Sequence, residues 1–414
     1  MNTSLNITLE RFDIIICGAG CAGLSFAYHL SKSIWANKKI LLIDANSKES
    51  NDRTWCFWSI EASPYACASS VQWDKLSFAG KNFEKTANIN PYKYYQITGL
   101  DFYNEIKTHL KQFPNIELRQ ESVQQIQDDH QYAIVHTDKT HYQANWIFNS
   151  IPQFSSAFPL PENTVKQYFK GFFIKTTEKS FQAQTVKLMD FSQQKSTNSL
   201  IKFFYVLPYN AHEALIECTV FATQKQDPET YQDDIRTYIK EKLAIQDFEI
   251  IGEEKGMIPM SDTPAPFKSS THIFQIGTTG GMTKASTGYT FNNIQKFCYY
   301  FFQNWRQDFQ KPPIKYENKQ KRFDFYDSLL LYIIKHYPKQ FQRLMENLFR
   351  KNDFKIILKF LDEESSIWDE ARLFITLPWQ PFFNAIYEQY FPIFSPNKQS
   401  THWRHINLGT TADK

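Results

Sequence analysis

The chain is poor in glycine, and more than half of its glycines lie in two short segments. Average usage would place about 29 glycines in a chain of this length, whereas the 414 residues contain 13. Seven of them fall in two clusters, within 18–23 and 277–288. Where glycine is scarce, such clusters mark positions at which the backbone needs a turn or a close approach that other residues hinder.

The first cluster has the spacing G-x-G-x-x-G inside a β-turn-α-β pattern. The apolar run 12–17 predicts a buried parallel strand, 24–35 predicts a helix and 40–44 predicts a second strand. In such a unit the glycines permit the tight turn, the approach of a pyrophosphate and close helix–strand packing. Asp44 ends the second strand, where an acid can bond a ribose hydroxyl. An ordinary strand–turn–helix connection is the alternative, but the whole context favours a dinucleotide site.

NAD and FAD proteins share this unit, and three features of the chain favour FAD. The unit stands near the N-terminus, a sheet-forming insertion follows it, and a second glycine cluster returns late in the sequence. In FAD folds of this kind the late segment crosses the flavin ring. A helix predicted over about 289–307 would direct its positive N-terminal end toward the N1/O2 edge of the ring and stabilise a negatively charged reduced flavin.

The remaining pattern predicts an α/β protein with a Rossmann-like FAD-binding domain of the glutathione-reductase and hydroxylase type. Further elements of that domain are expected as a helix over 100–112 and strands over 116–127, 132–137 and 145–150. The domain is expected to be discontinuous and to comprise residues 10–60, 97–150 and 250–312.

Strand alternation over 165–222, followed by a helical segment over 229–245, predicts an inserted antiparallel sheet that binds the substrate. This substrate domain is expected to comprise 61–96 and 151–249. Helical patterns between 324 and 391 predict a helical C-terminal region over 313–394, and a polar tail follows over 395–414.

Charge and cysteine usage exclude several classes of function. The 46 basic and 43 acidic residues give a net charge of +3, which does not suggest a nucleic-acid partner. The six cysteines lack metal-ligand spacing, so we expect no metal site and a reducing, cytoplasmic location. Because no uninterrupted run of about 18 apolar residues occurs, we expect no membrane-spanning helix.

Aromatic residues make up 16% of the chain, which has two interpretations. One is a core rich in phenylalanine. The other is an apolar binding tunnel or a surface that faces a membrane.

Four further segments carry a specific resemblance. They are DRTWCFW at 52–58, FFYVLP at 203–208 with EALIECTVF at 213–221, EKGMIPM at 254–260, and GTTGGMTKASTGYTFNNIQ at 277–295. In this order and spacing they resemble the lycopene cyclases, FAD-containing enzymes that close the end rings of carotenoids. The resemblance runs from about residue 11 to 390 and is closest to the bacterial β-cyclases.

The resemblance implies an isomerisation without net redox change. An acid would protonate the terminal double bond of a linear lycopene end group, the cation would close a β-ring, and a proton would leave. Glu217 occupies the position of the family's essential acid, and Cys218 stands where many members carry a second acid. The strand pattern alone favours a half-exposed surface residue at Glu217, and the resemblance reverses that interpretation.

The implied cofactor is FAD in its reduced form, with NADPH or NADH as a transient reductant. The first glycine turn, the end of the second strand and the late glycine segment are expected to hold the FAD, and Arg53 is either a further contact or a surface ion pair. The expected cofactor residues are Gly18, Ala19, Gly20, Cys21, Ala22, Gly23, Asp44, Ala45, Arg53, Val123, Gly277, Gly280, Gly281, Thr283, Gly288 and Tyr289.

Aromatic side chains would stabilise the carbocation, although core packing is the commoner use of such residues. The expected pocket residues are Trp55, Phe57, Trp58 and Thr219. Because lycopene is a C40 hydrocarbon dissolved in lipid, the enzyme is expected to associate peripherally with a membrane surface. The apolar segments 328–337 and 373–394 suit either this docking or ordinary helix packing.

Two other functions remain open at this stage. A flavin-dependent hydroxylase or polyprenyl reductase would share the fold, but DRTWCFW is not the signature of those enzymes. Their late flavin segment also carries Gly-Asp, where this chain has Gly277-Thr278. The second alternative is a non-catalytic flavoprotein that binds carotenoid or lipid.

Overall fold

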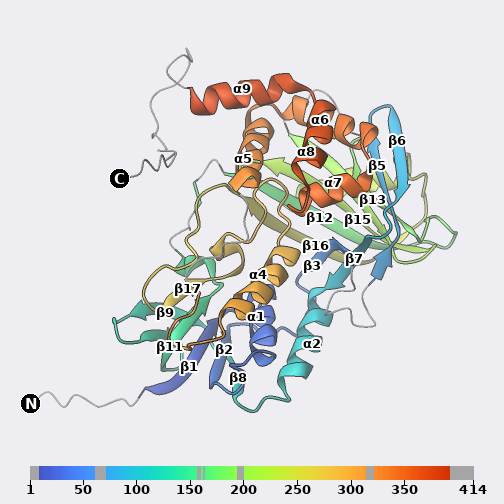
Figure 1. The fold of residues 1–414 in the computed structure, drawn as a ribbon. Helices are drawn as coiled ribbons and strands as arrows, with labels where there is room; N and C mark the ends of the chain where they lie inside the picture. The colour runs from blue at the N-terminus through green and yellow to red at the C-terminus, as the bar shows by residue number, and fades with distance from the viewer. Residues whose placement is uncertain are drawn as a thin grey trace, which may run out of the picture.

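Two large sheets, one mainly parallel at its centre and one mainly antiparallel, occupy two separate lobes of the protein. The computed structural model describes residues 9–60, 71–155, 160–161, 164–193, 200–313 and 321–391. Figure 1 shows one lobe built around β1, β2 and β11, and a second lobe in which α5–α9 lie against a large sheet. The predicted polar tail over 395–414 lies outside the described residues.

The first lobe contains the predicted β-turn-α-β unit. Strands β8, β2, β1 and β11 are adjacent and parallel, β17 extends the parallel part beside β11, and β10 and β9 continue the sheet antiparallel. The bounds are β1 Glu10–Cys17, β2 Ile40–Asp44, β8 Ile116–Gln120, β9 Val123–Asp128, β10 Ala133–Thr137, β11 His141–Asn149 and β17 Ile273–Gln275. The segment predicted as one strand over 116–127 is thus two strands in different parts of the sheet.

Three helices pack beside this sheet: α1 Cys21–Ser31, α2 Gly99–Leu110 and α4 Phe291–Asn304. Helix α1 begins within the first glycine cluster, directly after Gly20, and so three residues before the predicted start. Burial explains the strand pattern, because successive residues of β1 are packed on both faces: Ile14 and Ile16 in one core, and Ile15 and Cys17 in the other. A parallel strand covered on both faces needs such a continuous apolar run.

The second lobe is built on a seven-stranded sheet in the order β16-β12-β15-β14-β13-β5-β6. Its bounds are β5 Lys75–Gly80, β6 Phe83–Asn88, β12 Val165–Lys175, β13 Thr185–Asp190, β14 Ile201–Pro208, β15 Glu213–Ala222 and β16 Glu249–Met260. The pairing is antiparallel except between β13 and β5. The predicted antiparallel insertion is therefore present.

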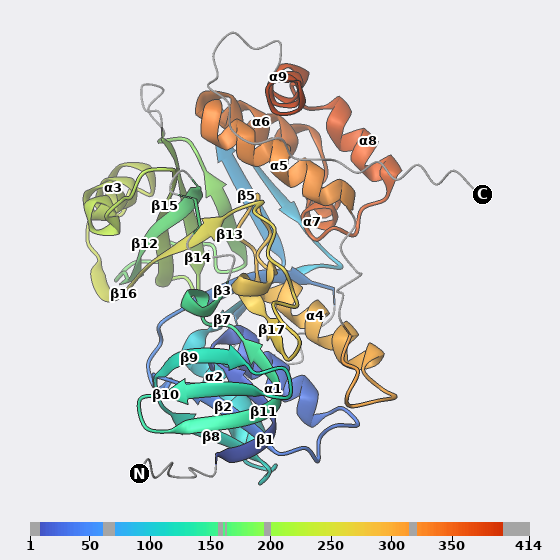
Figure 2. The ribbon, with the colours of Figure 1, turned by 90° about the vertical axis from the view of Figure 1, so that its left-hand side faces the viewer.

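Helices cover both faces of this sheet (Figure 2). One face packs on the short helix α3 Gln232–Thr237 and its flanking turns, whereas the opposite face packs beneath the C-terminal helices. The helix predicted over 229–245 is present as a continuous helical segment over 228–242, of which only α3 is α-helical; a 3-10 turn precedes it and a π-helical turn follows it. The C-terminal helices are α5 Lys321–His336, α6 Pro338–Lys351, α7 Phe354–Leu361, α8 Ile367–Ile375 and α9 Trp379–Tyr390.

Two segments pair with strands outside the domain to which the sequence assigned them. Residues 249–260, mostly assigned to the FAD-binding domain, form β16 and pair with β12 of the second sheet. A three-stranded sheet, β3-β7-β4, joins Thr54–Ser59 to Lys93–Thr98 and Val71–Trp73. Figure 2 places β3 and β7 between the two lobes, so these segments connect the lobes.

Candidate active site

The first glycine turn has the geometry that a dinucleotide pyrophosphate needs. Gly18 has a φ of +96°, and a Cβ on Gly23 would lie 1.8 Å from the carbonyl oxygen of Gly18. A Cβ on Gly20 would instead meet no atom within 4 Å. Gly20 is the N-cap of α1, and no side chain caps the helix there. The turn therefore leaves open space beside the positive end of a helix, where phosphate binds readily.

Other predicted cofactor residues surround this turn. The Oδ2 atom of Asp44 accepts a hydrogen bond of 2.7 Å from the backbone N–H of Ala19, and Ala45 follows it at the exposed strand end. Val123 begins β9, two residues after Glu121, whose backbone N–H donates to the carbonyl of Asp44.

Arg53 lies within electrostatic reach of Cys21, the first residue of α1. Burial raises the pKa of the Cys21 thiol to about 12, and the positive charge of Arg53 acts in the opposite direction. The Arg53 side chain is 67% exposed, and its ion-pair distance to Asp52 is 3.9 Å. A loosely paired cation close to the helix N-terminus suits contact with a phosphate.

The late glycine cluster packs directly against the first one. A Cβ on Gly277 would come 2.7 Å from the Cβ of Ala22. Gly277, Gly281 and Gly288 all have positive φ, and a Cβ on Gly280 would lie 2.3 Å from a carbonyl oxygen. At its other end Gly288 contacts Ile258 of β16. This segment therefore runs from the pyrophosphate turn to the sheet of the second lobe.

The remaining late residues complete that segment. Thr283 accepts a hydrogen bond of 3.0 Å from the hydroxyl of Thr290, the N-cap of α4. Tyr289 reaches toward Trp58, with ring centroids 4.8 Å apart. The buried indole Nε1–H of Trp58 has no hydrogen-bond partner in the described part of the chain. An open glycine cradle, an uncapped helix end and an unpaired buried donor fit a bound dinucleotide with a ring system near Tyr289.

Glu217 lies on the face of the second sheet that the C-terminal helices cover. It stands on β15 directly opposite Gly171 of β12 and Tyr205 of β14. The Thr219 hydroxyl, also a predicted pocket group, donates a hydrogen bond of 2.6 Å to its Oε1 atom. Glu217 is therefore an inward-facing acid and not a surface residue.

A second carboxyl group, which the sequence analysis did not assign, meets Glu217. Glu254 on β16 is also directly opposite Gly171, so the glycine separates two acids that share one face of the sheet. A hydrogen bond between the two carboxyl groups raises the pKa of Glu217 and lowers that of Glu254. Thr54 in turn donates a hydrogen bond of 2.6 Å to Glu254 Oε2.

Burial raises the pKa of both carboxyl groups. For Glu217 the pKa lies well above its ordinary value, with burial as the larger cause and the charge of Glu254 as the second. The pKa of Glu254 is raised by burial and lowered by hydrogen bonds from Thr54 and Glu217. Both residues keep some accessible surface, yet neither forms an ion pair within the described segments. The proton therefore resides on Glu217 when the pair holds one proton.

Tyrosine hydroxyls and one thiol face the carboxyl pair. The hydroxyls of Tyr94 and Tyr205 both share a hydrogen bond with that of Tyr289. Burial raises the pKa of all three phenols and of the Cys56 thiol. These groups stay protonated at neutral pH and present aromatic surface beside the acids.

Alternation along β3 divides the predicted aromatic pocket residues. Thr54, Cys56 and Trp58 face the carboxyl pair or Tyr289. Trp55 and Phe57 instead pack in the core of the first lobe against Phe291, with centroid distances of 5.9 and 4.6 Å. The structure therefore corrects the expectation for Trp55 and Phe57, because successive residues of a strand point to opposite faces.

Cys218 also faces away from the site. It is buried in the core between the sheet and α3, whereas Glu217 points to the opposite face. An acid next to Glu217 on this strand would not reach it for the same reason. The signal that could have found Glu254 is its place in the EKGMIPM segment, but only the register across Gly171 brings the two acids together.

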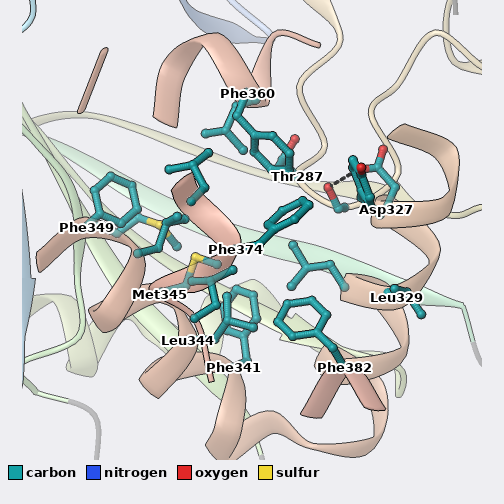
Figure 3. Close-up of a pocket in the computed structure, with 18 of the residues that line it drawn as sticks. Thr287, Asp327, Leu329, Phe341, Leu344, Met345, Phe349, Phe360, Phe374 and Phe382 are labelled. Carbon is teal, nitrogen blue, oxygen red and sulfur yellow. Dashed lines mark hydrogen bonds between the residues drawn. The ribbon is translucent and has the colours of Figure 1, made fainter. Parts of the chain in front are cut away.

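An apolar cavity of about 270 Å³ lies between this sheet face and the C-terminal helices. Tyr205 and Tyr289 line it near the carboxyl pair, and Trp379 and Phe383 line it on α9. Figure 3 shows further aromatic rings and Met345 around the same space. Further lining residues include Phe203, Phe221, Leu329, Phe341, Leu344, Phe349, Phe360, Phe374, Phe382 and Ile386.

A buried charge cluster fixes the late glycine segment beneath these helices. Lys284 lies 3.0 Å from Asp327 of α5 and 2.9 Å from Glu363, and its side chain is only 3% exposed. Ser286 donates a hydrogen bond of 2.7 Å to the same aspartate, drawn in Figure 3. Loss of one partner of such a buried ion pair would destabilise the fold. The cluster therefore holds α5, which forms part of the cavity wall, against the late glycine segment.

Several solved structures share this fold. A flavoprotein/dehydrogenase from Cytophaga hutchinsonii has a TM-score of 0.58 at 11% identity, covering 88% of this chain and 95% of its own. A geranylgeranyl bacteriochlorophyll reductase-like protein from Thermoplasma acidophilum has a TM-score of 0.55 at 11% identity, with coverages of 93% and 98%. A p-nitrophenol 4-monooxygenase from Pseudomonas putida has a TM-score of 0.51 at 12% identity, with coverages of 91% and 98%. These identities establish the α/β fold alone.

Sequence comparison identifies the family. A search of curated proteins found no match. The sequence model of the family described as "Lycopene cyclase protein" matches residues 13–387, which include the glycine turn and both glutamates. This match covers most of the chain, so the protein belongs to the lycopene cyclase family.

Proposed function

We propose that this protein is a lycopene β-cyclase, an isomerase that closes the linear end groups of lycopene to β-rings. The observation that carries the proposal is the inward-facing acid Glu217, whose cross-strand neighbour Tyr205 lines an apolar cavity. The family match supports a carotenoid substrate. The motif pattern supports the β type of ring, leading toward γ- and β-carotene.

The chemistry begins with proton transfer from Glu217. Burial raises the pKa of Glu217 well above its ordinary value, so the carboxyl group keeps its proton to higher pH than a free glutamate and can act as a general acid toward the terminal double bond. The resulting tertiary cation is attacked by the C5=C6 bond, which closes the ring. Loss of a proton from the ring restores a double bond. No atom or electron is gained, so substrate and product have the same mass.

Aromatic faces stabilise the positive charge during this sequence. Tyr205 and Tyr289 line the cavity near the acid, and Trp58 packs with its ring edge on Tyr289. A well-placed ring is worth about 0.5–2 kcal/mol to a cation. The pocket therefore favours a cationic intermediate while excluding water that would trap it.

We propose FAD as the cofactor, held by the two glycine clusters. Gly18, Gly20 and Gly23 would accommodate its pyrophosphate, and the segment from Gly277 to Tyr289 would pass along its ring. In its reduced form the bound FAD would supply a negative charge that stabilises a cation. NADPH or NADH is the proposed reductant.

The cavity suits one end of a carotenoid and not the whole molecule. Its volume of about 270 Å³ is below the usual range of about 300–1,000 Å³ for drug-sized ligands, and a C40 chain is larger than these. One end group would therefore enter while the rest of the chain remains outside. Trp379 and Phe383 border the cavity and are also exposed, at 54% and 61%, which places its mouth at α9.

We further propose that α8 and α9 rest on a membrane surface. Trp379, Phe383 and Tyr387 follow one another at intervals of four residues along α9, and Trp368 on α8 is 80% exposed. No helix among the described residues has the length and apolar character needed to cross a bilayer. Exposed aromatic residues on one helix face are typical of docking at the interface, in accord with a cytoplasmic protein that takes substrate from lipid.

Expression in cells that accumulate lycopene tests the proposed function. The expected product has the mass of lycopene and cyclic ends. A mass change of two hydrogens or one oxygen would instead indicate a reductase or a hydroxylase, and bound but unchanged pigment would indicate a binding protein. Glu217→Gln should abolish product. Glu213→Gln is the matched control on the same strand, because Glu213 pairs with Lys175 at 3.3 Å near the surface.

A further inference from the structure

We propose that Glu254 is the positioning residue for the acid, and that it forms with Glu217 a carboxyl pair sharing one proton. This inference rests on the proposed function of Glu217 and adds a second residue to it. Glu254 lies on a different strand and outside the segment that carries the family's acid.

The absence of a side chain at Gly171 makes the pair possible. Gly171 is the cross-strand partner of Glu217 on one side and of Glu254 on the other. A Cβ at this position would lie 3.1 Å from Glu254 Cγ and 2.8 Å from Leu215 Cδ1. Any larger residue would occupy the space over β12 through which the two carboxyl groups meet.

Each carboxyl group is held separately by a threonine. Thr219 donates to Glu217 and Thr54 donates to Glu254, each at 2.6 Å. Since both hydroxyls donate to oxygens, one oxygen of each acid remains for the contact between the acids. Two carboxylates this close cannot both ionise easily in a buried site, so the pair retains one proton.

The pair balances the protons of the reaction. Glu217 gives its proton to the terminal carbon–carbon double bond, which leaves two carboxylates beside the cation. The ring then closes and loses one proton, which returns to the pair and restores its starting state. One proton leaves and one comes back, so no other donor or acceptor is required.

The groups that face the pair do not compete for this proton. They are Tyr205 from β14, Tyr209 after it, Tyr94 from β7, Cys56 from β3 and Tyr289 from the late glycine segment. Burial raises the pKa of each of these groups, so they remain neutral where the acid pair titrates. The pH response of the site therefore belongs to the two glutamates.

The variant Glu254→Gln tests the proposal in the full-length protein supplied with reduced FAD and lycopene in liposomes. We expect kcat to fall at least about tenfold, within the range of general acid–base effects. Without the charge of Glu254, the alkaline limb of the kcat profile should move to lower pH. Glu254→Asp, which keeps the charge, should recover part of the rate and return the limb toward its original position.

A readout that does not depend on turnover follows the proton itself. Infrared spectra of the purified protein should show a protonated carboxyl band that persists to higher pH in the wild type than in Glu254→Gln. Glu217→Gln should remove that band. The matched control is Glu249→Gln, an exposed residue at the start of the same strand, which should change neither the band nor the rate.

The outcomes separate the two proposals. If the wild type cyclises lycopene but Glu254→Gln keeps its rate and pH limb, the inference is wrong and the proposed function stands. If the wild type does not cyclise lycopene, the proposed function fails, and the infrared titration still shows whether the acids share a proton.

Discussion

The hydroxyl of Thr54 donates a hydrogen bond of 2.6 Å to Glu254, although 200 positions separate the two residues in the chain. Thr54 lies on β3 of the small connecting sheet, and Glu254 lies on β16 of the large sheet. The contact therefore couples the strand that follows the dinucleotide unit to the carboxyl pair. Thr219 holds Glu217 in the same way from within β15.

Removal of the Thr54 hydroxyl should slow the reaction while leaving the fold intact. Thr54→Val keeps the shape of the side chain but cannot donate to Glu254. A hydrogen bond to a charged group is worth about 1.5–3 kcal/mol, so we expect kcat to fall about tenfold or more. Thr54→Ser should retain most activity. Steady-state assays on lycopene liposomes check both variants, and equal rates for Thr54→Val and wild type would contradict the role of the contact.

Insertion of a methyl group at Gly171 should separate the two acids. The added Cβ of Gly171→Ala would meet Glu254 Cγ at 3.1 Å, so we expect a fall in kcat of about tenfold, comparable with loss of one hydrogen bond. Gly252→Ala is the matched control on β16, because a Cβ there finds its nearest atom at an ordinary 3.4 Å. Gly171→Ala should unfold at a somewhat lower temperature than wild type, because its Cβ also meets Leu215 Cδ1 at 2.8 Å, whereas Gly252→Ala should stay close to wild type. Equal activity losses in the two would show that strand strain, and not separation of the acids, is responsible.

Replacement of the buried acid should stabilise the protein. The pKa of Glu217 is raised in the folded state by burial, so the fold binds this proton more tightly than the unfolded chain does. Its contribution is fully present below the unfolded pKa and is lost as pH rises through the folded pKa. Glu217→Gln should therefore be more stable than wild type at neutral and alkaline pH. We expect its free energy of unfolding to be higher by roughly 1 kcal/mol or more, and its unfolding temperature to be higher accordingly.

The same variant should show a flatter dependence of stability on pH. Unfolding curves recorded from mildly acidic to mildly alkaline pH check this expectation. Glu213→Gln, near the surface of the same strand, should keep the wild-type slope. A Glu217→Gln protein less stable than wild type at alkaline pH would contradict the burial of a neutral acid.

Local patterns predicted the dinucleotide turn because its requirements are local. The spacing of Gly18, Gly20 and Gly23 and the adjoining strands lie within one short segment, so chain geometry is almost fully specified there. The family motif also pointed to Glu217, which lies on the inward face of β15, and its role as the acid stays a proposal. Glu254 was not identified, because its role depends on the register of three strands that meet at Gly171. Register depends on long-range packing and on hydrogen bonding, neither of which is visible in the EKGMIPM segment.

The aromatic residues of β3 show a second limit of local patterns. The run from Thr54 to Ser59 is apolar on both faces because one face packs in the first lobe and the other faces the site. The pattern of apolar and polar residues along β3 therefore does not indicate which of its faces is turned toward the site. Trp55 and Phe57 belong to the core of the first lobe, and only the structure separates them from Trp58.

The glycine turn permits a direct test of the proposed cofactor. A Cβ at Gly20 meets nothing within 4 Å, and its backbone angles suit any residue, so Gly20→Ala should fold normally. The methyl group would occupy the space left for a pyrophosphate, and we expect FAD affinity to fall at least about tenfold. Release of FAD from the heat-denatured protein, measured by absorbance, checks this loss. Equal flavin content in variant and wild type would contradict the assignment of this turn.

The exposed face of α9 should determine membrane association. Trp379→Ser combined with Phe383→Ser removes two side chains that are 54% and 61% exposed, so stability should change little. Because each would bury apolar surface in lipid, worth about 25 cal/mol per Å², the double variant should bind liposomes at least about tenfold more weakly.

The matched control removes exposed aromatic residues from the other lobe. Tyr299 and Tyr300 on α4 are 54% and 41% exposed, and α4 lies away from α8 and α9 (Figure 1). Tyr299→Ser combined with Tyr300→Ser should leave liposome binding unchanged. Detergent-solubilised lycopene separates docking from chemistry. The α9 variant should regain the activity that it lost because the substrate had to leave a bilayer, and any loss that remains reflects the cavity wall that Trp379 and Phe383 also line. Equal liposome binding by both double variants would place the membrane contact elsewhere on the protein.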